Sequence, residues 1–292
     1  MKRLGVLANL NKQGADTVVR RLVEWCRSNQ VPLCLCDDLR ELATASERIV
    51  APHELPRESD IILSMGGDGS LLATARIVKD SGIPILGINI GSLGFLTEQT
   101  PEDLEGTLKR LIEGDFSLQE RMILAAELSG NDDDRIKFAL NDIVVGRGDI
   151  RLINLALYSN GDYICSYAAD GLILSTPTGS TAYSLAVGGP ILNPEMDAII
   201  ASPIAPHSLT SRPLIFSVEE TLTLEVKSET DVAMLTIDGQ VSTPLKYRDK
   251  IRIRKADFSV KLVRFEEQSF YKVLRSKLQW GVLPPRDATS RD

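Results

Sequence analysis

The sequence has little histidine and no long hydrophobic segment, and each of these absences excludes a class of protein. Its 292 residues include only two histidines, His53 and His207, so a histidine-based metal centre is not expected. No apolar run approaches the ~20 residues that a membrane-spanning helix needs. Residues 1–14 also lack the apolar segment and cleavage site of a signal peptide. We therefore expect neither a membrane protein nor a secreted one.

Cysteine is also scarce, and its spacing fits neither a disulfide framework nor a zinc site. The four cysteines are Cys26, Cys34, Cys36 and Cys165, and no two pairs stand at zinc-ligand spacing. We expect reduced, mostly buried thiols in a cytoplasmic protein. The net charge of −7 argues against a general nucleic-acid-binding protein, whose binding surface would be basic. It leaves open a small anionic ligand that is held by local dipoles.

Apolar runs alternate with helical patterns through about the first hundred residues. Strands are expected at 3–9, 31–36, 60–65 and 84–91, and helices at 15–29 and 70–80. Gly82 and Pro84 stand where the second helix should end. Because alternating strands and helices are typical of βαβ units, an open α/β (Rossmann-like) domain with a parallel sheet is expected.

From about residue 120 the pattern changes to short runs in which apolar and polar residues alternate. Leu222, Leu224 and Val226, for example, fall on one face of an expected strand. Repeated two-residue alternation predicts an antiparallel, sandwich-like β domain. The expected domains are an α/β domain at 1–118, a β-rich domain at 119–267, and a C-terminal helix and tail at 268–292 that pack back on the first domain.

A glycine cluster stands between an expected strand and an expected helix in DIILSMGGDGSLLATA, residues 60–75. A tight glycine turn at such a junction leaves backbone N–H groups pointing outward at the positive end of the helix dipole, which favours phosphate binding. Gly66, Gly67, Gly69 and Ser70 are expected to form this phosphate loop, with Ser70 as the helix N-cap. The loop matches neither GxxxxGK[ST] nor GxGxxG, so neither a P-loop nor the usual dinucleotide loop is indicated.

Asp68 lies inside this loop, where a carboxylate repels phosphate unless it binds a cation or accepts a proton. In phosphoryl transfer to an alcohol, a carboxylate can accept the hydroxyl proton while the loop holds the donor phosphates. The functional interpretation makes Asp68 that base. The alternative is an Asp-Gly turn in which the carboxylate bonds its own backbone.

A second unusual segment, AADGLILSTPTGSTAYSLAVGGPILNP at residues 168–194, combines glycine, proline and small hydroxyl residues. We expect a ligand site here, because such residues let a flat or polar ligand lie on the backbone. Tyr183 could stack on a base, and Asp170 could bond an amide or a ribose. The alternative is a Gly/Pro-rich turn inside a β domain.

Two shorter segments could add to such a site. Asn141 and Asp142 open an expected strand and suit hydrogen bonds to adenine and ribose, although an Asx turn is the simpler explanation of this pair alone. The segment at 236–240, with Asp238 and Gln240, has the sequence of a β-turn.

Taken together, these segments resemble the NAD kinase family, which they match in order over most of the chain. The matching segments are Gly66 to Gly69, Asn141-Asp142, DGLILSTPTGSTAYSLAVGGP from Asp170, PHSLTSRPL from Pro206, and DGQ from Asp238. The GGDG loop alone is weak evidence, because 6-phosphofructokinases and diacylglycerol or sphingosine kinases have a similar loop. The long second motif is specific. A lipid or sugar kinase that shares only the GGDG loop is the main alternative, and a non-catalytic nucleotide-binding module is another.

The resemblance implies transfer of the γ-phosphoryl group of ATP to the 2′-hydroxyl of the adenosine ribose of NAD, forming NADP. It also implies a divalent cation, usually Mg²⁺, and a homo-oligomer, a dimer or tetramer in which neighbouring subunits help to build the site. Asp68 would be the general base on the 2′-hydroxyl. The residues that the resemblance assigns to NAD binding are Asp68, Gly69, Asn141, Asp142, Arg151, Asp170, Thr181, Ala182, Tyr183, Ser184, Leu185, Ala186 and Gln240.

Two positions differ from the family pattern. Where the family often has Asn-Glu, this chain has Asn141-Asp142, so the carboxylate reaches one methylene less far. Where the family often has YSLSAGGP, this chain has YSLAVGGP, so Ala186 lacks a serine hydroxyl. Both differences concern contacts with NAD and leave the phosphate loop intact.

Overall fold

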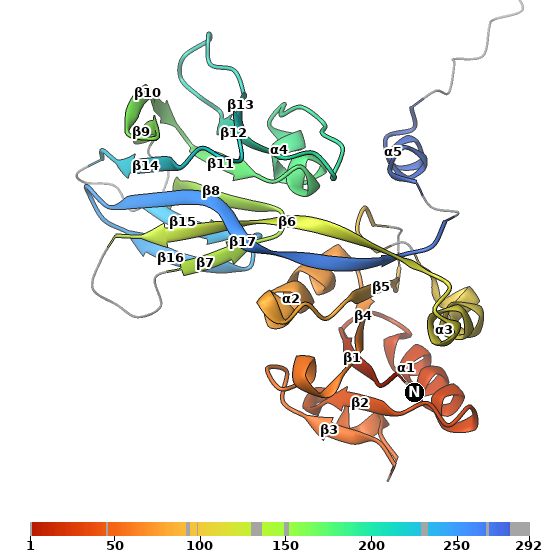
Figure 1. The fold of residues 1–292 in the computed structure, drawn as a ribbon. Coiled ribbons are helices and arrows are strands. Elements are labelled where there is room, and N and C mark those ends of the chain that lie inside the picture. The colour runs from red at the N-terminus through yellow and green to blue at the C-terminus, as the bar shows by residue number, and fades with distance from the viewer. Residues whose placement is uncertain are drawn as a thin grey trace, which may run out of the picture.

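The structure is a computed structural model that combines an N-terminal α/β half with a C-terminal β half (Figure 1). It describes residues 2–44, 46–91, 94–97, 99–129, 136–148, 152–228, 233–266 and 269–280. Its strands form two sheets, one of eleven strands and one of six. The expected fold class is therefore confirmed.

The N-terminal half is a parallel sheet with helices on both faces. Its elements are β1 (Leu4–Ala8), α1 (Ala15–Ser28), β2 (Leu33–Cys36), β3 (Arg48–Val50), β4 (Ile61–Gly66), α2 (Asp68–Val78), β5 (Ile85–Asn89) and α3 (Leu104–Glu113). The strands pair in parallel in the spatial order β5-β4-β1-β2-β3. The expected strands and helices are present. β3 was not expected, because three residues carry too little pattern to be recognised.

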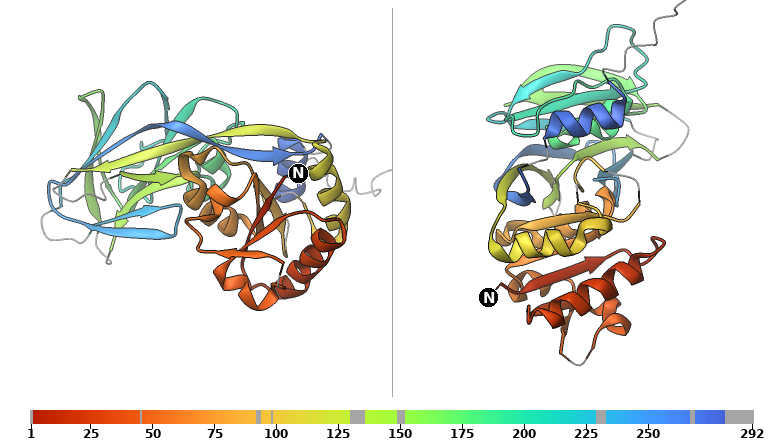
Figure 2. Two further views of the ribbon diagram at one scale, coloured as in Figure 1. Left: turned by 60° about the horizontal axis from the view of Figure 1, so that its bottom comes forward. Right: turned by 90° about the vertical axis from the view of Figure 1, so that its right-hand side faces the viewer.

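The apolar strands of this half are buried on both faces, as parallel sheets require. In β4, Ile61 and Leu63 pack in one cluster with residues of α1 and α3, whereas Ile62 packs in another with residues of α2. Figure 2 shows these helices against the sheet from two further sides. The glycine loop therefore stands at the carboxyl end of a central strand, where ligands of open α/β sheets usually bind.

The C-terminal half is an antiparallel β-sandwich with two helices. Its elements are β6 (Ser117–Leu128), β7 (Ile136–Ala139), β8 (Asp142–Arg147), β9 (Ile153–Ser159), β10 (Asp162–Ala169), β11 (Gly171–Ser175), α4 (Tyr183–Ala186), β12 (Ala198–Ile204), β13 (Leu214–Ser217), β14 (Leu222–Val226), β15 (Ala233–Ile237), β16 (Val241–Leu245), β17 (Lys250–Arg264) and α5 (Phe270–Leu278). The smaller sheet has the order β13-β12-β11-β8-β15-β16.

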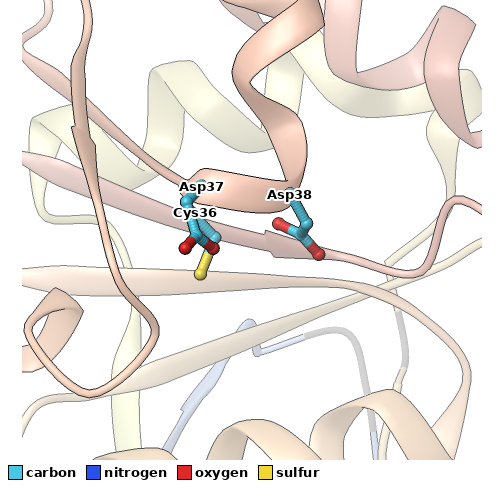
Figure 3. A group of neighbouring side chains, drawn as sticks. All are labelled: Cys36, Asp37 and Asp38. Carbon is cyan, nitrogen blue, oxygen red and sulfur yellow. The ribbon is translucent and has the colours of Figure 1, made fainter.

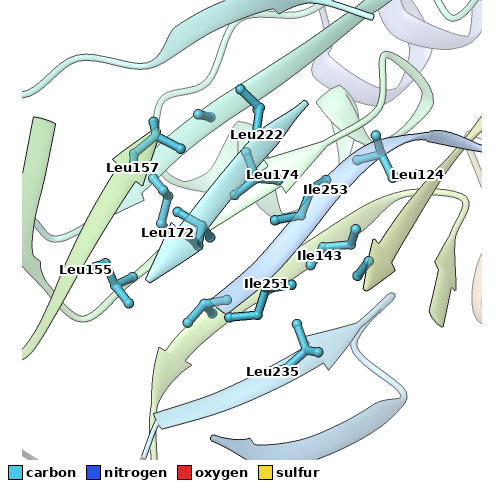
Figure 4. Close-up of a cluster of buried hydrophobic side chains, with 14 of the residues drawn as sticks. Leu124, Ile143, Leu155, Leu157, Leu172, Leu174, Leu222, Leu235, Ile251 and Ile253 are labelled. Atoms are coloured by element: carbon cyan, nitrogen blue, oxygen red, sulfur yellow. The ribbon is translucent and has the colours of Figure 1, made fainter. Parts of the chain in front are cut away.

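One hydrophobic core lies between the two sheets of this half. Leu172 and Leu174 enter it from β11 of the smaller sheet, and Leu155 and Leu157 enter it from β9 of the larger one (Figure 4). Leu222, Leu224 and Val226 of β14 are all fully buried there, as their alternation predicted.

β17 joins the two halves of the molecule. Ile253 in its first part pairs with Leu222 of β14, and Leu262 near its end pairs in parallel with Ile85 of β5. β6 pairs along β17 with a bulge between Lys255 and Ser259. The larger sheet is therefore continuous across both halves. The expected domain boundary at 118/119 falls within β6 and stays a prediction.

The C-terminal helix α5 follows β17 and lies in Figure 1 at the height of α4, to its right. The expectation that the C-terminal segment packs back on the first domain stays a prediction, and residues 281–292 lie outside the described part of the chain. The Ser269 side chain caps it by accepting a hydrogen bond from the N–H of Lys272 at 3.2 Å. Val273 and Leu274 are its buried residues, and Lys277 lines the same cavity as the residues of the glycine loop. Among the described residues, no helix is long and apolar enough to span a membrane.

Candidate active site

The glycine loop forms the junction between β4 and α2. Gly66 ends the strand, and Asp68 is the first residue of the helix. A Cβ atom at Gly66 would overlap Ser70 Oγ, so glycine allows the loop to approach the helix closely. The expectation that Ser70 caps the helix is wrong: Gly67 is the N-cap, and Ser70 lies in the first turn. Because the first N–H groups of a helix have no intrahelical acceptor, this junction is suited to an anion.

The Asp68 carboxylate is held by the backbone of a neighbouring loop. Oδ2 accepts a hydrogen bond from the N–H of Phe95 at 2.7 Å, and Oδ1 accepts from the N–H groups of Leu96 at 3.0 Å and Thr97 at 3.1 Å. The Thr97 hydroxyl also donates to Oδ1 at 3.1 Å. A Cβ atom at Gly94 would overlap the carboxylate, so glycine there lets the loop close around it. The structure thus replaces the alternative of a local Asp-Gly turn with a clamp between two separate segments.

A cavity of about 740 Å³, here called the phosphate-loop cavity, lies beside this junction. Its lining includes Asn9, Lys12, Gly67, Asp68, Gly69, Ser70, Thr74, Asn89, Gly94, Gln240 and Lys277. Asp68 is the only acidic residue in the lining among the described residues, whereas Lys12 and Lys277 bring two positive charges. Two lysines and a helix N-terminus together suit the phosphates of a nucleotide.

Asn9, Lys12 and Lys277 were missed in the sequence. Asn9 and Lys12 follow β1, which runs parallel to β4, so they stand at the same edge of the sheet as the glycine loop. Polar residues directly after a strand of a parallel sheet are a signal that could have identified them. Lys277 lies in α5, and no local pattern connects it with a loop so distant in the sequence.

A second cavity of about 400 Å³, here called the β-domain cavity, lies in the C-terminal half. Its lining is Asn141, Asp142, Val144, Ala182, Tyr183, Thr236, Asp238 and Gly239. Asn141 and Tyr183 come from separate motifs that the sequence had singled out. The Tyr183 side chain is 46% exposed, so one face of its ring is available to a ligand.

Asp238 fixes the backbone of residues 140–142, two of which line this cavity. Its Oδ1 accepts hydrogen bonds from the N–H groups of Asn141 at 2.8 Å and Asp142 at 3.1 Å, and its Oδ2 accepts from the N–H of Leu140 at 3.1 Å. Burial and the nearby charge of Asp238 raise the pKa of Asp142 to about 7. Burial also raises the pKa of Asp238. The lining of the β-domain cavity therefore contains two carboxyl groups that do not both ionise easily.

The pKa of Asp142 predicts how stability depends on pH. Since the native chain keeps this proton up to about pH 7 and the unfolded chain loses it near pH 3.8, the free energy of unfolding should fall across that interval as the pH rises. Asp142→Asn keeps the shape but removes the titration, so its stability should depend less steeply on pH. Urea unfolding at several pH values between about 5 and 8 measures this. Parallel curves for the two proteins would contradict the assignment.

The turn between β15 and β16 connects the two cavities. Asp238 and Gly239 adopt positive φ angles of 48° and 65°, as the central residues of a tight Asp-Gly hairpin turn do. Asp238 and Gly239 line the β-domain cavity, and the next residue, Gln240, lines the phosphate-loop cavity. Gln240 Nε2 donates to the carbonyl of Gly69 at 2.9 Å. The glycine loop and the residues of the β-domain cavity, which are far apart in the sequence, thus meet at this turn.

Most hydroxyl groups of the second motif bind the protein itself. Thr176 Oγ1 donates to the carbonyl of Leu140 at 2.6 Å, and Ser180 Oγ donates to the carbonyl of Pro177 at 2.7 Å. Ser184, assigned to NAD binding, is fully buried, and its Oγ is 2.9 Å from Ser202 Oγ. These three hydroxyls fasten the 176–184 segment to its neighbours, whereas Ser175 Oγ and Thr178 Oγ1 are buried without a hydrogen-bond partner among the described residues. The expected ligand site in this motif stays a prediction.

The other residues that the resemblance assigned to NAD binding in this half, where the structure describes them, are not in the lining of the β-domain cavity. Asp170 lies at the opposite end of β11, where its carboxylate pairs with Arg147 at 3.3 Å. Thr181 lines a further cavity of about 360 Å³ beside α5. Leu185 is half-buried and Ala186 is exposed, and neither is in the lining of the β-domain cavity. Arg151 lies outside the described residues.

The cysteines are free, and three of them are buried, as expected. Cys36 Sγ lies within reach of the carboxylates of Asp37 and Asp38 (Figure 3), the one possible group of metal ligands among the described residues. Burial, together with Asp38, raises the pKa of the Cys36 thiol to about 12, so the sulfur keeps its proton at neutral pH. This group is in the lining of neither cavity.

Comparison with known proteins identifies the family. The ATP-NAD kinase N-terminal domain model matches residues 4–116, and the ATP-NAD kinase C-terminal domain model matches residues 140–265. The chain belongs to the NAD kinase family. An NAD kinase from Heliobacterium modesticaldum is 40% identical over 287 residues, which cover 96% of this chain and 100% of that one. One from Koribacter versatilis is 41% identical, covering 96% and 99%.

Solved structures of this family have the same fold. An NAD kinase from Archaeoglobus fulgidus, solved in complex with ATP, superposes with a TM-score of 0.77 at 28% identity, covering 95% of this chain and 98% of that one. Yeast NADH kinase, solved with NADH, superposes with a TM-score of 0.90 at 21% identity, covering 99% and 90%. The family and the enzyme class inferred from the sequence are confirmed. Nothing in these comparisons supports a lipid or sugar kinase, because the match extends beyond the GGDG loop to residues 140–265 of the β-rich part.

Proposed function

We propose that this protein transfers the γ-phosphoryl group of ATP to the 2′-hydroxyl of the adenosine ribose of NAD, forming NADP. The observation that carries the proposal is the meeting of the two cavities at the turn 238–240. One cavity offers a phosphate loop with a clamped carboxylate, and the other offers polar groups and an aromatic ring suited to an adenosine. Relatives and neighbours named for NAD kinase activity, one of them solved with ATP, support the same reaction.

In this mechanism the phosphate-loop cavity holds the donor. The loop N–H groups, Lys12 and Lys277 bind the ATP phosphates and orient the γ-phosphorus toward the acceptor. Oδ2 of Asp68, whose one hydrogen bond within the described residues comes from Phe95, takes the proton of the 2′-hydroxyl. The ribose oxygen forms the new bond to phosphorus as the bond to the ADP oxygen breaks. The clamp keeps the Asp68 side chain in one orientation, so little conformational entropy is lost when the reacting groups come together.

The lining residues also fit the divalent cation that the family resemblance implies. Mg²⁺ at phosphoryl-transfer sites is bound mainly by substrate phosphates and water, so the ATP phosphates in this cavity would hold it and Asp68 would keep Oδ2 for the proton. When bound, the cation would offset the negative charge that the phosphates bring close to Asp68.

The β-domain cavity is the proposed site of the NAD adenosine. Asn141 Oδ1 is buried and has no hydrogen-bond partner within the described part of the chain, so an amine of the ligand would satisfy it. Asp142 is proposed to bond the ribose or the base, and Tyr183 to stack on the adenine. Thr181, Ala182, Leu185 and Ala186 would border the dinucleotide, and the main chain of Ser184 would hold their segment in place.

The position of Asp170 supports the proposed homo-oligomer. Asp170 precedes Ser175 by five positions along the chain, and Ser175 pairs with Asp142, so Asp170 is about 17 Å along the strand from the cavity of its own chain. We infer that Asp170 acts in the site of a neighbouring subunit. The free thiols and the lack of a membrane-spanning helix among the described residues accord with a cytoplasmic enzyme.

Mixed oligomers test this inference. Asp170→Ala and Tyr183→Ala should each lose activity, but a random equimolar mixture of the two chains should recover about a quarter of wild-type activity, because a quarter of all sites in the mixture then hold neither substitution. The rate of NADP formation measures the recovery, and each variant mixed with itself is the control. No recovery, with subunit exchange verified by native mass spectrometry, would show that Asp170 does not act in the site of a neighbouring subunit.

Lys277 provides a test of the donor site. Lys277→Gln removes a charge that we expect to contact the ATP phosphates, and kcat/KM for ATP should fall about tenfold while KM for NAD changes little. Arg275→Gln is the matched control, because Arg275 is a cation on the same helix outside the lining. Equal effects of the two substitutions would assign the loss to general electrostatics.

The reaction itself is tested by incubating the protein with Mg²⁺, ATP and NAD and following NADP with an NADP-specific dehydrogenase. Polyphosphate as donor and NADH as acceptor, tested in parallel, define the substrate range. Binding of ATP and NAD without NADP formation would overturn the proposed activity.

A further inference from the structure

Another cavity, of about 190 Å³, lies where α2 meets the strands of the C-terminal half. It is called here the α2 cavity. Its lining is Ala75, Arg76 and Lys79 from the end of α2, Ile123, Ile136, Lys137, Phe138, Leu140 and Phe258 from the larger sheet and its edge, and Ile237, Asp238 and Val241 from the turn between β15 and β16. It shares Asp238 with the lining of the β-domain cavity and no lining residue with the phosphate-loop cavity.

The lining combines apolar walls with three cationic side chains. Phe138 and Phe258 form an edge-to-face pair with centroids 5.0 Å apart, and several aliphatic side chains complete the walls. Arg76, Lys79 and Lys137 contribute the positive charges. An apolar cavity with a few convergent charged groups is the usual composition of a small-molecule site.

Arg76 carries the strongest indication of a ligand. One of its guanidinium nitrogens, Nη2, donates to Gln240 Oε1. The other, Nη1, is buried and meets no hydrogen-bond acceptor in the described residues. A buried donor of a charged group without an acceptor is costly, and a ligand carboxylate would satisfy it.

The carboxylate already in the lining does not fill this role. Asp238 uses both oxygens to accept hydrogen bonds from the N–H groups of residues 140–142. Its charge reduces the positive potential without removing it, because three cations face one carboxyl group whose pKa burial raises. The site therefore favours an anion of low charge over a cation.

The volume limits the ligand to a small molecule. A water molecule occupies about 30 Å³ in the liquid, and a cavity of about 150 Å³ accommodates a benzene ring. At about 190 Å³, the α2 cavity has room for one ring and a carboxylate but not for a nucleotide.

We propose that the α2 cavity binds a small carboxylate with an apolar ring, and that its occupancy changes the rate of phosphoryl transfer. The carboxylate would bind Arg76 and Lys79, and the ring would pack between the phenylalanines. Arg76 holds Gln240, and Gln240 holds the carbonyl of Gly69 in the phosphate loop. A ligand that draws Arg76 toward itself weakens this connection. Only the effect on rate rests on the proposed function; the binding does not.

The binding is tested with two probes of nearly equal shape on the full chain. 4-Fluorobenzoate, observed by fluorine NMR, should bind with a dissociation constant of about 0.1–1 mM, and the neutral 4-fluorobenzamide should bind at least tenfold more weakly. Saturating NAD and an unreactive ATP analogue should not displace the benzoate. Displacement by either nucleotide, or equal binding of the two probes, would overturn the proposal.

Variants of the lining locate the probe. Lys79→Gln should weaken benzoate binding severalfold, whereas Lys79→Arg should retain it; Lys79 is exposed, so both variants should fold. Val241→Phe fills the cavity and should abolish binding, with thermal unfolding as the check on its fold. Unchanged binding in Lys79→Gln and in folded Val241→Phe would refute this location.

The effect on catalysis is measured separately. In wild type, saturating benzoate should change kcat for NADP formation at least twofold, and in folded Val241→Phe it should change nothing. Benzoate binding without a rate change would refute the coupling alone. Absence of NADP formation in wild type, with benzoate still bound, would refute the proposed function and leave the site intact.

Discussion

Asp68→Asn is expected to lower kcat by roughly 10²–10⁴-fold while NAD still binds, the usual size of a general-base effect. Asparagine keeps an oxygen in the place of Oδ1, which accepts from Leu96 and Thr97, but it replaces the second carboxylate oxygen with an amide that cannot take a proton. The measurements are steady-state kinetics and calorimetric titration with NAD.

A carboxylate just beyond the far end of the same helix gives the control for Asp68. Asp80 follows α2 at the end remote from the loop and is exposed, so Asp80→Asn removes the same charge without touching the site. Its kcat should match wild type. Near-wild-type turnover in Asp68→Asn would defeat the role of Asp68 as the base, whatever the control showed.

Gly94→Ala is expected to lower kcat by about 10–10²-fold, because the new Cβ atom would overlap the Asp68 carboxylate. It would also lie 2.6 Å from Thr97 Oγ1, so the loop that donates hydrogen bonds to Asp68 must move away. The base would remain present but lose its fixed orientation. Kinetics measure the loss, and a crystal structure of the variant should show the carboxylate displaced.

A second glycine separates this effect from that of an added methyl group. A Cβ atom at Gly146 would meet its nearest neighbours at 3.6 and 3.8 Å, which is ordinary contact, so Gly146→Ala should keep its kcat. Both variants should unfold cooperatively near the wild-type temperature. Wild-type kcat in Gly94→Ala would show that the clamp is not needed for the chemistry.

Features that depend on neighbouring residues could be predicted from the sequence. The parallel strands, the glycine loop after β4 and the alternation in β14 follow from local periodicity and from the freedom of glycine, which a short segment displays by itself. The hairpin turn at Asn160 and Gly161, whose φ angles are 48° and 93°, also follows from its two central residues. The exception is Ser70: the N-cap of the helix is Gly67, three residues earlier than the capping pattern suggested.

Features that depend on strand register and on contacts between distant segments could not be predicted from the sequence. The pairing of Ser175 with Asp142 places Asp170 at the wrong end of its strand for its own cavity, and no local pattern reveals that. The small hydroxyls looked like a ligand surface because composition does not tell whether a side chain points inward; burial does. Family resemblance named most of the site but not Lys12 or Lys277.

The sequence by itself determined the family, the phosphate loop and the carboxylate within it, because these are properties of contiguous residues. Only the tertiary structure decided that residues 94–97 clamp that carboxylate, that one hairpin turn joins two cavities, and that burial beside Asp238 moves the pKa of Asp142 to about 7. Distances between remote segments and the desolvation of a charge are determined by tertiary packing, and no short segment of the chain determines that packing.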